Sequence, residues 1–195
     1  MSGERASLPP RDWRHVRTDR LRLDAPTPDD VAGLHAIHSD PTSWTHFPQG
    51  RHGDPAVTAA MVEEQLARWP LHGLGYWTVR EVDGGPVVGW GGCSVPDGVS
   101  WWNLAYRFAT WTHGQGYGHE LARQALDAAA ALDPSLPVVA YLLEHNLASR
   151  RVAERAGLRL VWRGPDAGNE DDTAVRLVYA DRDLEPEALA HLAAH

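Results

Sequence analysis

A glycine-rich segment is the part of this 195-residue sequence whose residue types and spacing point most directly to chemistry. It reads His113-Gly114-Gln115-Gly116-Tyr117-Gly118-His119-Glu120 and lies between an aromatic, strand-like segment and an amphipathic helical one. Glycines let the backbone approach a ligand closely, and the free N–H groups at a helix start, with the helix dipole behind them, favour an anion. We therefore predict an anion site suited to a pyrophosphate; a tight structural turn is the alternative interpretation.

A second polar segment, Asn146-Leu147-Ala148-Ser149, begins about thirty residues later. Asn146 is a good helix N-cap, and Gly157 suits the left-handed residue that ends a helix. The spacing therefore predicts a short helix between these two residues.

Together the two segments resemble signatures of the GNAT acetyltransferases. Gly116 and Gly118 match the acyl-CoA motif Gln/Arg-x-x-Gly-x-Gly/Ala, with His113 in place of the usual Gln or Arg. Residues 146–158 resemble the signature Asn-x-x-Ser-x-x-x-x-x-x-x-Gly-Phe of the RimJ/RimL-type branch, and residues 18–23 resemble its opening strand.

The resemblance implies a fold and a cofactor. The fold is a single GNAT-like α/β (α+β) domain over residues 15–182, with a mixed, mostly antiparallel sheet that is splayed at its central strands and flanked by helices. Acetyl-CoA would lie in the splay between residues 99–109 and 138–143. Backbone N–H groups of residues 115–119 would bind its pyrophosphate, and main chain near residues 106–108 would hold its pantetheine arm. The implied cofactor-binding residues are Tyr106, Arg107, Phe108, His113, Gly114, Gln115, Gly116, Tyr117, Gly118, His119, Asn146 and Ser149.

The implied reaction is N-acetyl transfer from acetyl-CoA to a primary amine of a small molecule or a protein N-terminus, by direct attack in a ternary complex. Such an attack needs a neutral amine, close placement and a donor for the oxyanion. Many GNAT enzymes carry, where this chain has Ala153, a tyrosine that protonates the departing thiolate. The RimJ/RimL-type branch lacks this tyrosine and has a serine where Ser149 stands. Ser149 is therefore a candidate general acid; the alternative is a capping or cofactor-contact role.

A general base and an acceptor pocket must come from other segments, because residues 99–110 contain no Asp, Glu or His. His46 is the candidate base, since histidine titrates near neutral pH. His35, His38 and the acidic turn at residues 170–172 are alternatives, and a merely solvated histidine is the simplest interpretation. The candidate acceptor-binding residues are Trp44, His46, Phe47, Trp101 and Trp102, each weighed against plain packing.

Local patterns predict the elements that position these residues. The order is β-α-α-β-β-β-α-β-α-β-β, typical of one mixed α/β domain. Residues 1–14 are expected to form a flexible tail, and residues 183–195 a second tail with helical tendency. The expected strands are 21–24, 76–82, 87–90, 99–109, 138–143, 158–163 and 173–180, and the expected helices are 28–39, 55–69, 116–132 and 146–157.

Composition limits the classes of partner and location. The formal charge of -8 argues against nucleic acid or an anionic membrane as a partner. The absence of a long apolar stretch or a secretory signal favours a cytoplasmic protein. Cys93, the single cysteine, has no cysteine partner for a disulfide or zinc cluster, and no metal site is expected.

Two other functions are compatible with the motifs. A non-catalytic acyl-CoA-binding regulatory module would explain the missing tyrosine and base. A nucleotide-binding protein could use the same turn, although no Lys-Ser/Thr pair follows the glycines and no βαβ unit surrounds them. An apolar sheet edge would also permit a homodimer.

Overall fold

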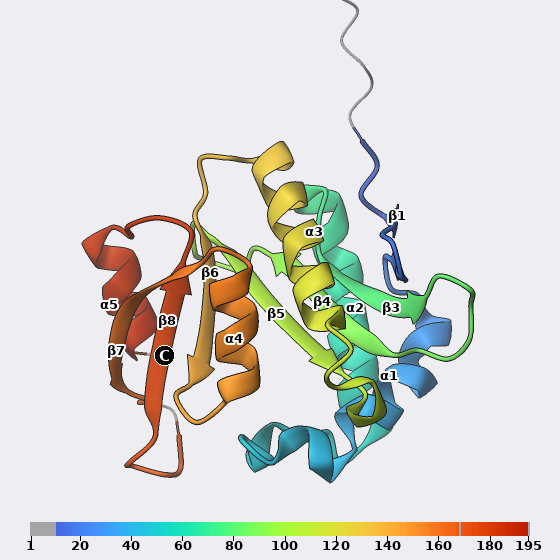
Figure 1. Cartoon of the computed structure of the whole chain (residues 1–195), viewed down its shortest axis with the longest axis horizontal. Helices are drawn as coiled ribbons and strands as arrows, with labels where there is room; N and C mark the ends of the chain where they lie inside the picture. Colours follow the sequence, from blue (N-terminus) through green and yellow to red (C-terminus); the bar gives the residue numbers. More distant parts are fainter. Residues whose placement is uncertain (1–10, 168, 195) are drawn as a thin grey trace, which may run out of the picture.

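The computed structural model describes residues 11–167 and 169–194. Its centre is one eight-stranded sheet with the strand order β1-β2-β3-β4-β5-β6-β8-β7 (Figure 1). Neighbouring strands are antiparallel except for β5 and β6, which are parallel. The strands are β1 (His15–Arg17), β2 (Leu21–Asp24), β3 (Tyr76–Glu81), β4 (Gly89–Ser94), β5 (Trp102–Phe108), β6 (Val138–Leu143), β7 (Arg159–Pro165) and β8 (Val175–Ala180).

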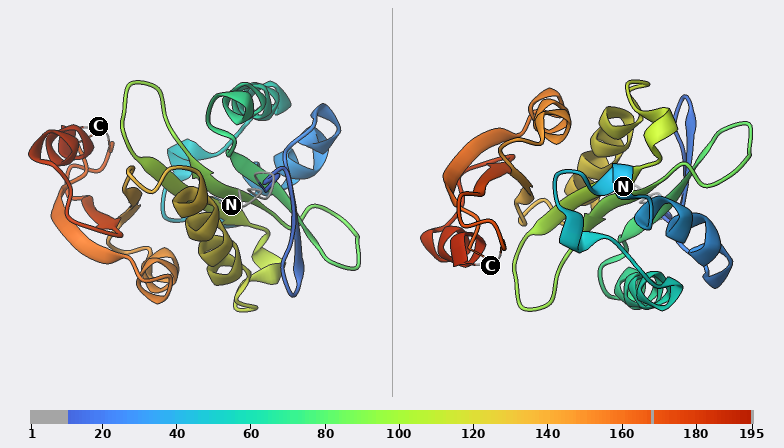
Figure 2. Two further views of the ribbon diagram at one scale, coloured as in Figure 1. Left: turned by 90° about the horizontal axis from the view of Figure 1, so that it is seen from above. Right: turned by 90° about the horizontal axis from the view of Figure 1, so that it is seen from below.

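Helices cover both faces of this sheet. Figure 2 shows α3 and α4 on one face and α1, α2 and α5 on the other. They are α1 (Val31–His38), α2 (Pro55–His72), α3 (Tyr117–Leu132), α4 (Leu147–Arg155) and α5 (Pro186–Ala194). This arrangement confirms the predicted GNAT-like α/β fold with its mixed sheet. No helix within the described ranges is both long and apolar enough to cross a membrane.

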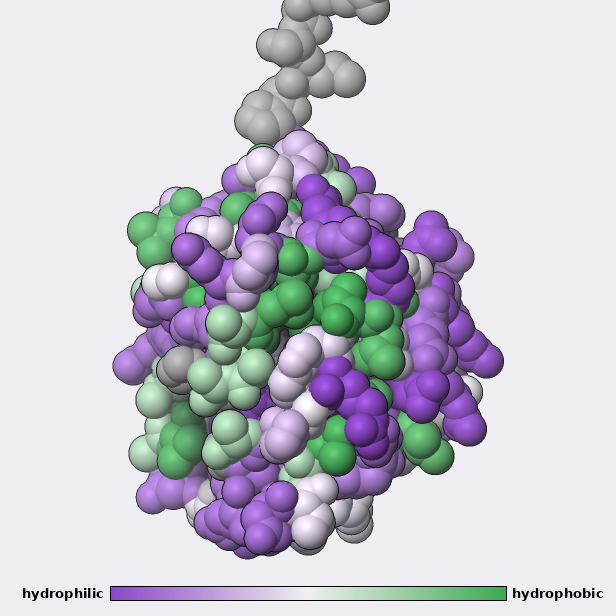
Figure 3. Space-filling view, turned by 90° about the vertical axis from the view of Figure 1, so that its left-hand side faces the viewer, coloured by the Kyte–Doolittle hydropathy of each residue, from purple (hydrophilic) through white to green (hydrophobic). Residues whose placement is uncertain are grey.

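Packing on the two faces follows from strand alternation. The α3 face of the sheet buries Trp77, Leu121 and Tyr179 in one large cluster, and Cys93 is fully buried there. The α5 face buries Trp101 and residues of β6 and β8 in a smaller one. Figure 3 shows the side of the molecule that faces left in Figure 1, where apolar and polar residues are mixed.

The N-terminal region is more ordered than the sequence predicts. Trp13 is only 5% exposed, and its carbonyl accepts a hydrogen bond from Trp77 Nε1 at 2.8 Å. β1 then pairs with β2. A three-residue strand with one buried side chain, Val16, is too short to show a period, so the sequence did not predict it. The predicted tail is wrong only at its last two residues, Trp13 and Arg14, whose carbonyls both accept hydrogen bonds. The first ten residues of that tail lie outside the described range.

The central strands separate, as predicted. β5 and β6 pair only at Trp102 with Val138 and at Asn103 with Val139. Beyond these two pairs β5 remains bonded to β4 and β6 to β8, so the two strands diverge. The divergence opens a cleft in the middle of the sheet.

Candidate functional site

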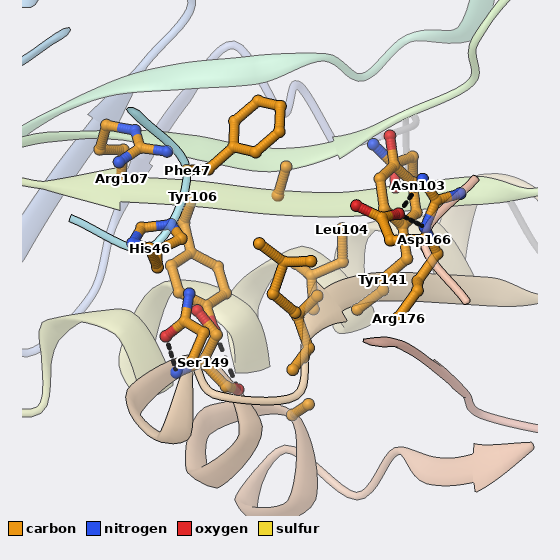
Figure 4. A pocket seen from close by; sticks show the side chains of 16 residues that line it. His46, Phe47, Asn103, Leu104, Tyr106, Arg107, Tyr141, Ser149, Asp166 and Arg176 are labelled. Carbon is orange, nitrogen blue, oxygen red and sulfur yellow. Dashed lines mark hydrogen bonds and ion pairs between the residues drawn. The ribbon is translucent and has the colours of Figure 1, made fainter. Parts of the chain in front are cut away.

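The cleft has a volume of about 280 Å³ and lies where β5 and β6 diverge. Figure 4 shows its two ends: His46, Arg107 and Ser149 lie toward one, and Asp166 and Arg176 toward the other. Its lining residues are His46, Phe47, Asn103, Leu104, Ala105, Tyr106, Arg107, Ala140, Tyr141, Leu142, Leu143, Asn146, Ser149, Ala153, Asp166 and Arg176.

The glycine-rich turn leads directly into α3. Gly114 and Gly116 have φ values of 82° and 83°, a left-handed conformation that glycine adopts without steric cost. Glu120 N donates to Gly116 O, which leaves the preceding first-turn N–H groups without an intrahelical acceptor. A Cβ on Gly118 would lie 3.5 Å from Val152 and 3.7 Å from Tyr106. The turn therefore offers N–H groups in a confined space, which fits a pyrophosphate.

The side chains of this turn mostly point away from that space. Tyr117 is 8% exposed and donates from its hydroxyl to Glu81 at 2.7 Å. The His113 ring bonds Phe108 O at 3.2 Å, and His119 Nδ1 is buried with no hydrogen-bond partner in the described chain. The turn would thus bind an anion through its backbone.

Arg20 holds the turn from outside, a role that was not predicted from the sequence. Its Nη1 donates to Gln115 O at 2.6 Å, and its Nε donates to Glu120 Oε2 at 2.7 Å. Thr18 Oγ1 donates to the other oxygen of Glu120 at 2.5 Å. Thr18 and Arg20 belong to residues 18–23, which resemble the opening strand of the RimJ/RimL-type branch. That resemblance was the sequence feature that could have pointed to their role.

Backbone amides of β5 face the cleft. Trp102 N donates to Pro137 O on the β6 side, and Ala109 N donates to Val88 O on the β4 side. Amides alternate in direction along a strand, so those of Tyr106 and Phe108 face the gap left by β6. These two N–H donors can therefore bind an oxygen of a ligand in the cleft.

The side chain of Tyr106 spans the space between β5 and α4. Its hydroxyl donates to Ser149 O at 3.3 Å, and burial raises the pKa of the phenol to about 12. The group therefore remains a neutral hydrogen-bond donor at neutral pH.

Asn146 and Ser149 lie together at the start of α4. The Asn146 side-chain oxygen accepts from Ser149 N at 3.1 Å, as the predicted N-cap requires. This bond uses the amide of Ser149, so the hydroxyl is not needed for the cap. Ala153, where many GNAT enzymes have a tyrosine, is 2% exposed and also lines the cleft.

The segment between α1 and α2 supplies one wall of the cleft through His46 and Phe47. Burial, together with the charge of Arg107 and with His145, lowers the pKa of His46 to about 4. His46 is therefore neutral at pH 7 but only weakly basic. Trp44 does not line the cleft; it is 8% exposed and lies behind Arg107.

Other predicted site residues lie elsewhere. Trp101 packs against the His191 ring at 5.4 Å, and Trp102 donates from Nε1 to Asp133 O at 3.3 Å. Both tryptophans are packing residues outside the cleft, which corrects the prediction that they wall an acceptor pocket. Alternation explains the error, since the adjacent pair points into the two cores on opposite faces of the sheet.

The alternative bases also lie outside the cleft lining. His38 is 3% exposed, and burial is the main cause that lowers its pKa to about 3. His35 bonds Thr58 Oγ1 at 2.9 Å. Asp171, in the acidic turn, is exposed and accepts from Thr173 Oγ1 at 2.6 Å.

The far end of the cleft contains an ion pair that was not predicted from the sequence. Asp166 and Arg176 form it with side-chain exposures of 7% and 9%. Arg176 also donates to Leu192 O at 2.9 Å and lies over the Tyr141 ring. The only sequence signal is one acid and one base near facing positions of the β7–β8 hairpin.

Comparison with known proteins identifies the family. Residues 20–159 match the family described as acetyltransferase (GNAT) domain. An acetyltransferase from Agrobacterium tumefaciens is 24% identical, with 94% of this chain and 99% of that chain covered and a TM-score of 0.69. A GNAT-family acetyltransferase from Bacillus anthracis is 19% identical, with coverages of 85% and 96% and a TM-score of 0.70.

A RimL ribosomal L7/L12 α-N-protein acetyltransferase in complex with coenzyme A is 17% identical, with coverages of 86% and 96% and a TM-score of 0.70. These structural likenesses support the fold alone. The family is shown by the match over residues 20–159, which is well over half of the chain. The protein therefore belongs to the GNAT family of acetyl-CoA-dependent acetyltransferases.

Proposed function

We propose that this acetyltransferase acts on a primary amine, by direct attack on the thioester in a ternary complex. The observation that supports this mechanism is the two-sided cleft. Tyr106 extends from β5 toward Ser149 on the α4 side, whereas its neighbour Arg107 extends toward Ser43 on the other side. A donor and an acceptor can therefore approach from opposite faces and meet between the strands.

The residues of the chain divide the work of transfer. Acetyl-CoA supplies an activated acetyl thioester, whose C–S bond breaks as the C–N bond to the amine forms. First-turn amides of α3 would hold the pyrophosphate, and the β5 amides of Tyr106 and Phe108 would donate to the arm or to the carbonyl oxygen. Ser149 is the proposed donor of the proton that the departing thiolate takes up.

No side chain in the cleft lining is a strong base that could remove a proton from the amine. His46 lies at the same end of the cleft as Ser149 and is neutral, but a pKa of about 4 makes it a poor base for an ammonium group. We propose that the acceptor enters as the neutral amine, with His46 as a hydrogen-bond acceptor for its N–H. After the attack, the nitrogen passes one proton to Ser149 Oγ as Ser149 gives its own proton to the thiolate, so that the products are the neutral amide and the CoA thiol.

The RimJ/RimL-type branch is our proposal for the place of this chain within the family. It is supported by the Asn146–Ser149 spacing and by the fold shared with RimL, whose name describes action on a ribosomal protein N-terminus. A protein N-terminus and a small-molecule amine are the two acceptor classes that follow.

Initial-rate kinetics test the proposal. Acetyl-CoA and an amine from a broad panel are varied together while release of the CoA thiol is followed. Intersecting reciprocal plots are expected for a ternary complex, and parallel plots would instead indicate a covalent acetyl-enzyme. Tight acetyl-CoA binding with no turnover on any amine or peptide would favour the regulatory module. Thermal protection by ATP but not by CoA would favour a nucleotide-binding protein.

A further inference from the structure

Arg107 is held in the cleft by two contacts that do not neutralise it. Its guanidinium carbon lies 3.3 Å from the centroid of the Trp44 ring, and its Nη1 donates to Ser43 O. The carbonyl and the ring satisfy one N–H group and one face of the guanidinium. A guanidinium has five N–H donors, so most of its donor capacity is left for another partner.

The charge of Arg107 has no acidic partner within the described residues. The other arginines with largely buried side chains each have one: Arg68 pairs with Glu64 at 2.9 Å, Arg80 with Asp30 at 2.5 Å, and Arg176 with Asp166. Burial lowers the pKa of Arg107 to about 10, so the group stays charged at neutral pH. A desolvated charge without a counter-charge is unfavourable in a protein interior.

Histidines surround Arg107 instead of carboxylates. The charge of Arg107 contributes to lowering the pKa values of His38, His46 and His52, after the larger effect of burial. They are therefore neutral at pH 7 and supply no negative charge.

The cleft as a whole is consequently positive. Its charged lining residues are Arg107, Arg176 and Asp166, and the last two form an ion pair. The positive charge of Arg107 therefore gives the cleft lining a net positive charge, although the whole chain carries a formal charge of -8. A site that is positive within an acidic protein selects for a negative ligand group.

We propose that Arg107 binds an anionic group of the acceptor, so that the substrate is a small primary amine carrying a carboxylate or a phosphate. The inference rests on the proposed N-acetyltransferase function and narrows its acceptor class. A planar guanidinium suits both anions, because two parallel N–H donors match two oxygens. The same positive charge disfavours an ammonium group nearby, which helps the amine to enter in its neutral, nucleophilic form.

Matched acceptor pairs test this proposal in the wild-type enzyme. The pairs are α-amino acids against their amides, and phosphoethanolamine against ethanolamine; kcat/KM is measured for each with saturating acetyl-CoA. We expect the anionic member of at least one pair to be preferred by about tenfold or more, as for a charge-assisted contact. The pair that shows the preference identifies the anion. Equal or better use of the neutral members, or of uncharged peptide N-termini, would overturn the proposal while leaving N-acetyl transfer intact.

Variants of Arg107 then locate the preference. Arg107→Gln should remove the anionic preference by lowering kcat/KM for the charged member about tenfold while changing the neutral member little. Arg107→Lys keeps the charge and should retain part of the preference. Arg159→Gln, on β7 and outside the cleft lining, makes the same change of net charge and should have no effect.

A purely structural role for Arg107 gives a different result. If the side chain only holds the loop through Ser43 and Trp44, Arg107→Gln would slow both members of every pair equally, and the proposal would fail. Affinity for CoA, measured by calorimetry on the same variant, should stay within about twofold. Absence of turnover with every amine, despite CoA binding, would instead refute the proposed function on which the inference rests.

Discussion

At the residue scale, Gly118 has no side chain at the start of α3, beside the proposed pyrophosphate site. A Cβ at this position would stand 3.5 Å from Val152 and 3.7 Å from Tyr106, ordinary contacts that a helix can tolerate. We expect Gly118→Val to fold but to weaken CoA binding by about tenfold or more, because the branched side chain fills the space beside the first-turn amides. Isothermal titration calorimetry measures the change.

A glycine in open space provides the control for that substitution. A Cβ on Gly53 would meet no atom within 4 Å, so Gly53→Val should leave CoA affinity unchanged. Gly116→Ala strains a left-handed residue and should also weaken binding. Unaltered affinity in both the Gly116 and the Gly118 variants would remove the anion site from the turn.

A substitution of Ser149 distinguishes a role in CoA binding from a role in the chemical step. The Asn146 cap uses the amide of Ser149, so Ser149→Ala should preserve α4 and keep the CoA dissociation constant within about twofold. If the hydroxyl protonates the thiolate, kcat should fall by about a hundredfold, a usual size for a lost general acid. Stopped-flow single turnovers test the chemical step directly; a wild-type rate would return Ser149 to a contact role.

At the scale of elements, the β1–β2 hairpin orients the turn that we propose to bind the pyrophosphate. Arg20 binds Gln115 O, and within a trans peptide the next N–H points the opposite way. The Gly116 amide is thereby directed away from Arg20. We expect Arg20→Ala to weaken CoA binding by about tenfold while leaving the KM of a short acetyl thioester that lacks the pyrophosphate unchanged.

Arg22 offers the matched control on the same hairpin. Its ion pair is with Asp24, at 2.8 Å on its own strand, rather than with the turn, so Arg22→Ala should bind CoA as the wild type does. A loss of activity toward both thioesters in Arg20→Ala would mean that the hairpin only supports the fold.

Elements with strong local signals could be predicted from the sequence. The N-cap Asn146 and the glycines before α3 located both helix starts to within a residue, because capping and left-handed turns depend on neighbours in the chain. α2 instead runs three residues past its predicted end at Trp69, since Pro70 is tolerated in its last turn.

The other charged residues of the cleft could not be predicted in the same way. Arg107 comes from β5, Asp166 follows β7, and Arg176 lies on β8. Asp166 and Arg176 pair across the β7–β8 hairpin, but they reach the same cleft as Arg107 only because β8 lies beside β6, an order that local periodicity does not encode. Glycine motifs indicate the proposed cofactor site because they are local in the sequence, whereas the charged lining of the cleft depends on strand order.

At the scale of the whole molecule, buried histidines couple stability to pH. Burial lowers the pKa of His38 to about 3 and of His46 to about 4, below the ordinary value near 6.5. The unfolded chain therefore binds more protons than the folded one between these values and pH 6.5. The stability contributed by the neutral rings is complete above pH 6.5 and is lost as the pH falls toward the folded values.

We therefore expect the free energy of unfolding to fall between pH 6.5 and pH 5 by roughly 1 kcal/mol per pH unit for each of these histidines. Urea unfolding at several pH values measures the slope. His38→Leu should reduce it, because both ring nitrogens of His38 are buried without a hydrogen-bond partner in the described chain and a leucine can occupy the site.

The exposed His72 supplies the comparison, since His72→Leu should leave the wild-type slope. His38 stacks on His52 at 4.6 Å between ring centroids, and Trp44 donates to His38 O at 2.6 Å. Acid should therefore loosen the segment that carries His46 before it unfolds the sheet. A slope in His38→Leu equal to that of the wild type would show that the pH dependence comes from other groups, and the proposed coupling between this cluster and stability would be wrong.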